Sequence, residues 1–261
     1  MARRWALILF SGLVFLTGSR SAEATTYNFV GVTTANDGVS PNPIAEEHDS
    51  DQFPWDAAGH VNDTATPSDA EYVNISADNT SQWVSDDPGA GDYLPIEFKF
   101  FIESPDILTN INLLWNGNTD DANNIAHSIW VLADGTSETT ASNWTQIGGT
   151  TSINQDVDTD VSRDIAASFS TYVNATTGLI EWVLFPNKTS SDVRTNYVQV
   201  VTSTAVDISG TTNLGNGVTV RVAVNNTLQA QTGTTSGGTW TISGVVDIPQ
   251  NATITVWADG V

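Results

Sequence analysis

Short runs of alternating apolar and polar residues recur along most of the chain, separated by Gly, Asn, Asp, Ser and Pro. In one of them the side chains of Ile96, Phe98 and Phe100 share a face, and the charged residues between them share the other. Val218–Val224 repeats this two-residue period with its valines. Strands this short, with turn residues between them, predict an all-β protein built from sandwiches or barrels.

The expected strands fall into two series. The first comprises Tyr27–Val32, Gln82–Ser85, Ile96–Ile102, Asn110–Trp115, His127–Leu132, Trp144–Gly148, Leu179–Phe185 and Asn196–Thr202. The second comprises Val206–Ser209, Val218–Val224, Leu228–Thr232, Thr239–Ile242 and Thr253–Trp257.

Two stretches depart from the strand pattern. Asp164 can cap a helix, and after it Ile165, Phe169 and either Tyr172 or Val173 recur at helical spacing. A short surface helix is therefore predicted there. Residues 36–70 are rich in Pro, Asp, Asn, Ser and Thr and are predicted to form a long loop or a partly ordered arm.

The N-terminus has the features of a secretory signal peptide. Arg3 and Arg4 precede the apolar run Ala6–Gly18, and Ala22-Glu23-Ala24 fits a signal-peptidase site. A membrane anchor is the alternative, but a spanning helix needs about 20 apolar residues. We therefore expect residues 1–24 to be removed and the mature chain to be secreted or displayed at the cell surface, without membrane insertion.

Charge and cysteine content narrow the possible partners. The formal net charge is −22 and there is no cysteine. Such a charge opposes binding to nucleic acid or to anionic lipid, and it favours solubility or divalent cations. Without disulfides, the domains of an exported protein must be held by their own cores or by ions.

Two modules are expected, residues 25–204 and residues 205–261. The first resembles jelly-roll, galactose-binding-like modules of prokaryotic surface proteins, through Phe98–Glu103, Ile111–Gly117, His127–Val131, Asn143–Gly148, Phe169–Val173 with Gly178, and Asn196–Val200. The second resembles bacterial immunoglobulin-like repeats, through Ile208–Gly210, Val218–Val224, Gly238–Ile242 and Ile254–Gly260. The resemblance implies a binding module followed by a spacer. The second module ends directly after a strand and is expected to be incomplete, with further repeats downstream.

Calcium is the best-motivated ligand in the sequence. Calcium takes six to eight oxygen ligands, which closely spaced Asp and Asn residues can supply. A structural Ca²⁺ is predicted at one of two stretches, and a solvated acidic loop is the alternative for each. The candidate ligands are Asn116, Asn118, Asp120 and Asp121 in the first stretch, and Asp156, Asp158 and Asp160 in the second.

Sugar binding would require exposed aromatic rings beside polar groups. Trp55, Trp83 and Trp144 lie near expected loops or strand ends and are the candidate carbohydrate-binding residues. Packing in a loop or in the core is the alternative for each of them.

Catalysis has little support in the sequence. The three histidines, His48, His60 and His127, are scattered and lie in no known catalytic motif. Glycosidases use paired carboxylates, and Glu97 and Glu181 lie in expected strands, but solvent-facing strand positions explain both. We therefore expect no enzyme.

The favoured hypothesis is a non-catalytic extracellular or cell-surface protein, structural or adhesive, whose partner is an extracellular glycan or a surface protein. The alternative is a carbohydrate-binding module of a larger secreted enzyme.

Overall fold

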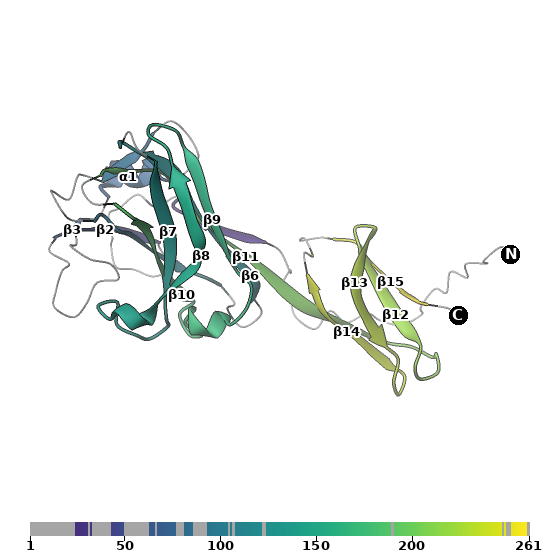
Figure 1. Ribbon diagram of the computed structural model, residues 1–261. Coiled ribbons are helices and arrows are strands. Elements are labelled where there is room, and N and C mark those ends of the chain that lie inside the picture. The colour runs from purple at the N-terminus through teal and green to yellow at the C-terminus, as the bar shows by residue number, and fades with distance from the viewer. Residues whose placement is uncertain are drawn as a thin grey trace. The chain divides into compact units, whose positions relative to one another are not determined.

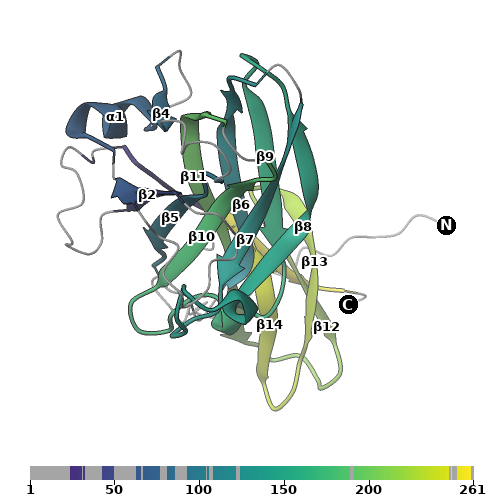
Figure 2. The same ribbon diagram turned by 60° about the vertical axis from the view of Figure 1, so that its left-hand side comes forward.

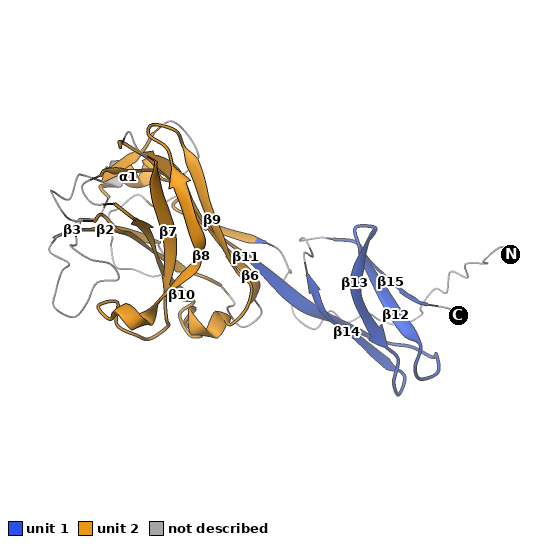
Figure 3. Cartoon of the chain, in the orientation of Figure 1, with its two compact units in different colours: residues 1–24, 203–261 blue, residues 25–202 orange. Residues whose placement is uncertain are grey.

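The computed structural model describes residues 24–30, 32, 43–49, 63–65, 67–76, 81–85, 93–103, 105, 108–121, 124–188, 191–246, 248 and 252–259. The predicted signal peptide, apart from Ala24, and also Trp55 and His60 lie outside the described residues. The chain divides into two compact units, one of residues 25–202 and one that contains residues 203–261 (Figure 3).

The first unit is a sandwich of two sheets (Figures 1 and 2). Its elements are β1 (Thr25–Asn28), β2 (Ile44–Asp49), β3 (Asp63–Ala65), α1 (Asp69–Asn74), β4 (Trp83–Ser85), β5 (Ile96–Phe101), β6 (Leu108–Thr119), β7 (Ile125–Leu132), the 3-10 helix η2 (Ala141–Asn143), β8 (Trp144–Ile153), β9 (Thr159–Ile165), the 3-10 helix η3 (Phe169–Thr171), β10 (Leu179–Pro186) and the first part of β11 (Val193–Thr211). The β11 sheet has the order β1-β11-β6-β9, with β4 also paired to β11, and the β10 sheet has the order β3-β2-β5-β10-β7-β8.

The strand order is that of a jelly roll. Eight strands, β1 and β5 to β11, carry the sandwich, and their pairing is antiparallel wherever a register is defined. Numbered in chain order, the first, eighth, third and sixth lie side by side in one sheet, and the second, seventh, fourth and fifth in the other. Eight strands in two such sheets form the two Greek keys of a jelly roll. The prediction of an all-β, jelly-roll-like sandwich is therefore confirmed.

The core explains why these segments form strands. On β5 the side chains of Ile96, Phe98 and Phe100 are buried between the sheets, where they meet the fully buried rings of Trp115 and Trp182. The alternate residues of β5 must then point to the other face of the β10 sheet. That outer face, which carries the charged residues of β5, is where the candidate site lies.

Residues 36–70, predicted to be a long loop or a partly ordered arm, contain regular structure. Strand β2 pairs with β5, β3 pairs with β2, and α1 begins at Asp69. Strand β2 escaped prediction because its sequence, Ile-Ala-Glu-Glu-His-Asp, is charged and lacks a clear apolar alternation. This correction matters because β2 supplies two residues of the candidate site.

The helix predicted from Asp164 is wrong. Asp164 and Ile165 end strand β9, and only the three-residue turn η3 follows. Ser168, between Ile165 and Phe169, has φ of 60°, a left-handed conformation that interrupts a right-handed helix. Among the described residues no helix is long and apolar enough to cross a membrane.

The second unit has its own core. Its strands are β12 (Thr219–Val224), β13 (Thr227–Thr234), β14 (Thr239–Val246) and β15 (Ile254–Ala258), together with the last part of β11. The order β13-β12-β15 forms a three-stranded sheet, and β14 pairs with Ala205–Thr211 of β11. Trp240, Ile242 and the valines of β12 are buried together. The immunoglobulin-like assignment of this unit stays a prediction.

Candidate functional site

A row of side chains crosses the outer face of the β10 sheet. Residues that lie directly opposite each other on antiparallel strands point to the same face. The register places Gln146, Trp130, Val183, Glu97 and Glu46 in one such row, on β8, β7, β10, β5 and β2 in turn. At about 4.8 Å between strands, the row is about 19 Å long. Lys99 and Glu181 form a register pair beside it.

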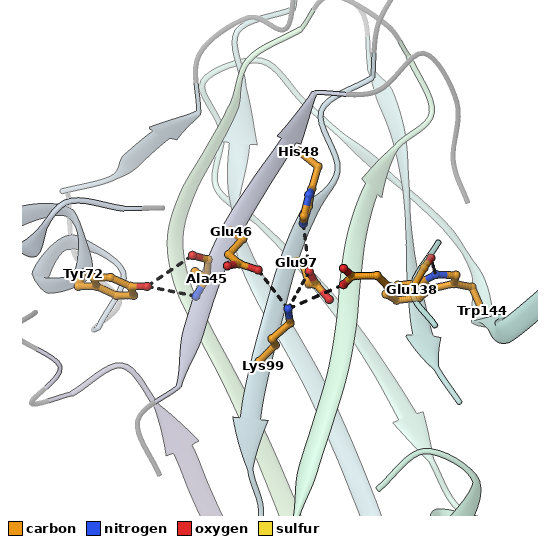
Figure 4. Close-up of polar contacts among 8 residues, drawn as sticks. All are labelled: Ala45, Glu46, His48, Tyr72, Glu97, Lys99, Glu138 and Trp144. Carbon is orange, nitrogen blue, oxygen red and sulfur yellow. Dashed lines mark hydrogen bonds and ion pairs between the residues drawn. The ribbon is translucent and has the colours of Figure 1, made fainter. Parts of the chain in front are cut away.

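A charged cluster occupies the β2–β5 end of this row (Figure 4). Glu97 is 0% exposed, and its Oε2 accepts a hydrogen bond from Nε2 of His48 at 3.0 Å. The same oxygen lies 3.3 Å from Nζ of Lys99. That ammonium is also 3.1 Å from Oε2 of Glu46 and 3.9 Å from Oε2 of Glu138. The single ammonium of Lys99 is therefore shared by three carboxylates.

The pKa values of these groups are shifted in different directions because their environments differ. Burial pushes the pKa of Glu97 upward, but the hydrogen bond from His48 and the charge of Lys99 outweigh burial, so its pKa is lowered. Burial and the charge of Glu97 raise the pKa of Glu181 to about 7. The same two causes raise the pKa of Glu138. Burial lowers the pKa of Lys99, but Glu97 and Glu46 outweigh it and hold that pKa above its ordinary value. The cluster thus contains a firmly ionised carboxylate beside carboxyls that hold protons more readily.

Two contacts fix the cluster, one from α1 to β2 and one from β8 to the loop that carries Glu138. The hydroxyl of Tyr72, a buried residue of α1, lies 3.3 Å from the backbone nitrogen and 3.4 Å from the backbone oxygen of Ala45 on β2 (Figure 4). This contact holds the edge strand that carries Glu46 and His48. On the other side, the indole nitrogen of Trp144 donates to the backbone oxygen of Glu138 at 2.7 Å.

Aromatic side chains cover the β7–β8 end of the same face. Leu132, Trp144, Val183 and Phe185 form a small buried cluster of their own, separate from the core between the sheets. Tyr93 and Trp130 pack against it and stay partly exposed. Their exposed ring surface lies beside the charged cluster, so this face offers both apolar and hydrogen-bonding surface.

The structure buries two of the three tryptophans predicted to bind sugar. Trp83 is 3% exposed and Trp144 is 4% exposed, so neither meets the exposure that a sugar platform requires. Trp83 belongs to the main core, where β4 pairs with β11. Trp55 lies outside the described residues.

The two stretches predicted as alternative calcium loops lie side by side. Asn116 opposes Asp160 across β6 and β9, and its Nδ2 donates to Oδ1 of Asp160 at 2.7 Å. Asn118 donates in the same way to Oδ1 of Asp158 at 2.7 Å. Oδ1 of Asn118 is buried and has no hydrogen-bond partner among the described residues.

The remaining acidic residues of these stretches have nitrogen partners. Oδ1 of Asp156 lies 2.6 Å from Nη1 of Arg194, and Asp121 pairs with Lys188. Asp120 accepts from the backbone nitrogen of residue 192 at 3.1 Å. Calcium at this end of the β11 sheet stays a prediction, because the oxygens gather there but amides and cations already engage most of them.

Most residues of the charged cluster escaped the sequence analysis. Glu97 and Glu181 were candidates, and the structure brings them onto one face, but Glu46, Lys99 and Glu138 were not singled out. The available signal was the alternation of β5, which places Glu97 and Lys99 together outside the core. Nothing in the sequence indicated that β2 would lie beside them. His127 is in the core instead, where its ring stacks on Trp115.

Two groups of these residues have the geometry to hold a metal ion. The potential ligand atoms of Glu46, His48 and Glu97 all lie within 4.8 Å of one another. The same is true of Glu97, Glu138 and Glu181. Glu97 belongs to both groups.

Neither protein-family models nor curated proteins match this sequence. Among solved structures, the CBM22-1 xylan-binding domain of Xyn10C from Paenibacillus barcinonensis is similar at 7% identity and a TM-score of 0.31, over 48% of this chain and 82% of that one. A carbohydrate-binding module CBM28, specific for non-crystalline cellulose, has 12% identity and a TM-score of 0.24, over 48% and 80%. The K2 cleaved adhesin domain of Lys-gingipain has 10% identity and a TM-score of 0.29, over 74% and 98%. Likeness at this level identifies no ligand for this chain.

Proposed function

We propose that the unit of residues 25–202 is a non-catalytic glycan-binding module that uses the outer face of its β10 sheet. The observation that carries this proposal is the row across that face. Partly exposed aromatic rings lie at one end of the row, and a network of charged hydrogen-bonding groups lies at the other. In an exported protein the second unit would extend this module from its point of attachment.

The chemistry of the face suits a sugar chain. A sugar ring presents an apolar C–H surface, which packs on an aromatic ring, and a rim of hydroxyls, which need oriented donors and acceptors. Trp130 and Tyr93 offer the first kind of surface. Lys99, Glu138 and Glu181 offer the second, because each is partly exposed on the same face. The strongly negative charge of the chain favours neutral over acidic glycans.

Burial of Glu97 argues against its use as a catalytic carboxyl. A glycosidase needs two carboxyls that both reach the scissile bond. Glu181 is accessible, but Glu97 is 0% exposed and is held by His48 and Lys99. A sugar on this face would therefore meet Lys99 and the carboxyls of Glu138 and Glu181, but not that of Glu97.

The test is a glycan and polysaccharide array with the untagged chain of residues 25–261. We expect binding to neutral glycans, and Trp130→Ala should weaken it at least about tenfold, the cost of losing a central aromatic contact. Tyr197→Ala is the matched control, because Tyr197 is a partly exposed aromatic on β11, in the other sheet. Its binding should equal that of the wild type.

Several results would contradict the proposal. If the folded chain binds no glycan, or if Tyr197→Ala is as damaging as Trp130→Ala, the outer face of the β10 sheet is not a glycan site. Binding of surface proteins in place of glycans would support the adhesive hypothesis. Release of reducing sugar from a bound polysaccharide would refute the non-catalytic role.

A further inference from the structure

We infer that Glu46, His48 and Glu97 form a binding site for a divalent transition-metal ion of the Zn²⁺ class, in which Lys99 competes with the ion. This inference does not depend on glycan binding. It begins with Glu97, a carboxylate with no exposed surface, because an ionised group removed from water is costly unless its oxygens are matched. Only one oxygen of this carboxylate has a hydrogen-bond or ion-pair partner among the described residues.

The two oxygens of Glu97 differ sharply. Oε2 accepts from His48 and faces the Lys99 ammonium. Oε1 is buried and has no hydrogen-bond partner among the described residues. Buried oxygens without partners are rare in folded proteins, and a bound ion is one explanation for such an atom. The free oxygen therefore points independently to a ligand beside Glu97.

The neighbouring side chains supply the rest of a metal site. The ligand atoms of Glu46, His48 and Glu97 lie within 4.8 Å of one another. Bonds of about 2 Å from zinc to imidazole nitrogen or carboxylate oxygen would place such atoms about 3–4 Å apart, so only a small contraction is needed. One imidazole with two carboxylates favours a transition ion over calcium, which prefers oxygen ligands.

Charge also favours a cation at this point. Glu46 and Glu97 face a single ammonium, which Glu138 shares. The second potential group, of Glu97, Glu138 and Glu181, contains only carboxylates. It lacks a nitrogen ligand, so the His48 side of Glu97 is the more specific place for the ion.

Lys99 sets the strength of binding. Its ammonium lies 3.1 Å from Glu46 and 3.3 Å from Glu97, so it neutralises the same carboxylates that would hold the ion. Binding must also displace the proton that Nε2 of His48 donates to Glu97, because a ligating nitrogen uses its lone pair. Removing the ammonium should therefore strengthen metal binding. In an ordinary ion-pair network without a metal ion, the same removal would only weaken the network.

Isothermal titration of ZnCl₂ into the untagged, chelator-treated chain of residues 25–261 tests the site, with CaCl₂ titrated in parallel. We expect one zinc per chain and weaker calcium binding. His48→Asn and Glu46→Gln should each weaken zinc binding at least about tenfold. Glu138→Gln, the matched control on the other side of Glu97, should leave it within about twofold. Lys99→Met should tighten it about tenfold or more, since a cation then no longer lies beside the ion.

Melting temperatures of the metal-free proteins separate a binding effect from a folding defect. Zinc should raise the melting temperature of the wild type and of Glu138→Gln, and not that of His48→Asn. The inference is overturned if zinc does not bind stoichiometrically, if His48→Asn folds and binds zinc like the wild type, or if Lys99→Met weakens binding. Loss of zinc in Glu138→Gln with retention in His48→Asn would move the ion to the all-carboxylate group and also refute it.

Discussion

Acidification is expected to destabilise the first unit through one buried imidazole, that of His127. This ring is fully buried between the sheets, stacks on Trp115 at a centroid distance of 6.0 Å and bonds through Nδ1 to the backbone oxygen of Ile125 at 3.1 Å. Its Nε2 has no hydrogen-bond partner among the described residues. Burial lowers the pKa of His127 to about 4, because an imidazolium there would lack water.

The magnitude follows from linkage. An unfolded histidine has a pKa of about 6.5, so between about pH 6.5 and pH 4 the unfolded chain binds a proton that the folded chain does not. The free energy of unfolding therefore falls as the pH is lowered through this window, by about 3 kcal/mol in all from this group. Above about pH 7 this group contributes no pH dependence.

The assay compares the wild type with His127→Phe by urea unfolding, followed by tryptophan fluorescence, from pH 4 to pH 8. Phenylalanine keeps a ring against Trp115 but cannot titrate, and it loses the hydrogen bond to Ile125, which costs about 1 kcal/mol at neutral pH. Because carboxyl groups titrate in both proteins, the difference between the two curves isolates His127. The imidazole signal that disappears from the NMR spectrum of the variant identifies His127, and its titration gives the folded pKa.

The reasoning is refuted if both proteins lose the same stability between pH 7 and pH 4. It is also refuted if the imidazole of folded His127 titrates near pH 6.5.

Two further predictions concern a turn and the calcium hypothesis. Gly178 has φ of +73°, and an added Cβ would lie 2.0 Å from the backbone oxygen of Ile102, so Gly178→Ala should lower the free energy of unfolding by about 3 kcal/mol. Gly135→Ala, at φ +67° in open space, should cost only about 1 kcal/mol in the same urea titration, and equal losses would contradict the role of the close contact. Calcium should raise the melting temperature of the wild type relative to chelator, and Asp158→Ala should abolish that rise, because Asp158 and Asn118 meet where the two acidic stretches join. Identical melting curves with calcium and with chelator would exclude a stabilising ion there.

The sandwich itself was predictable because its strands alternate. Ile96, Phe98 and Phe100 are buried as their spacing indicates, and Val220 and Val222 are likewise buried in the second unit. A two-residue period reports directly which face meets a core, whatever the partner strand is. The apolar stripe from Ile165 to Tyr172 led to the wrong prediction of a helix because spacing reports only which residues meet the core. Its residues do pack against the core, but they do so from a strand end and a turn, and periodicity alone does not distinguish these.

The candidate site was less predictable, because contacts between distant segments create it. Glu46 and Glu97 are register partners across β2 and β5, yet the charged sequence of β2 does not signal a strand. Trp144 was expected near a loop or strand end, but it is buried in the small cluster that also contains Phe185. A single sequence shows which side chains point away from a core, and not which of them the fold then covers.

The sharing of Lys99 by several carboxylates has an evolutionary consequence. Outward positions of a strand normally change one at a time without disturbing the core. Here replacement of Lys99 alone would leave Glu97 buried without its cation, and replacement of Glu97 alone would leave His48 and Lys99 without their common acceptor. We therefore expect descendants of this sequence to exchange positions 48, 97 and 99 together, and the positions around Trp130 that we propose to contact glycans to diversify independently of them.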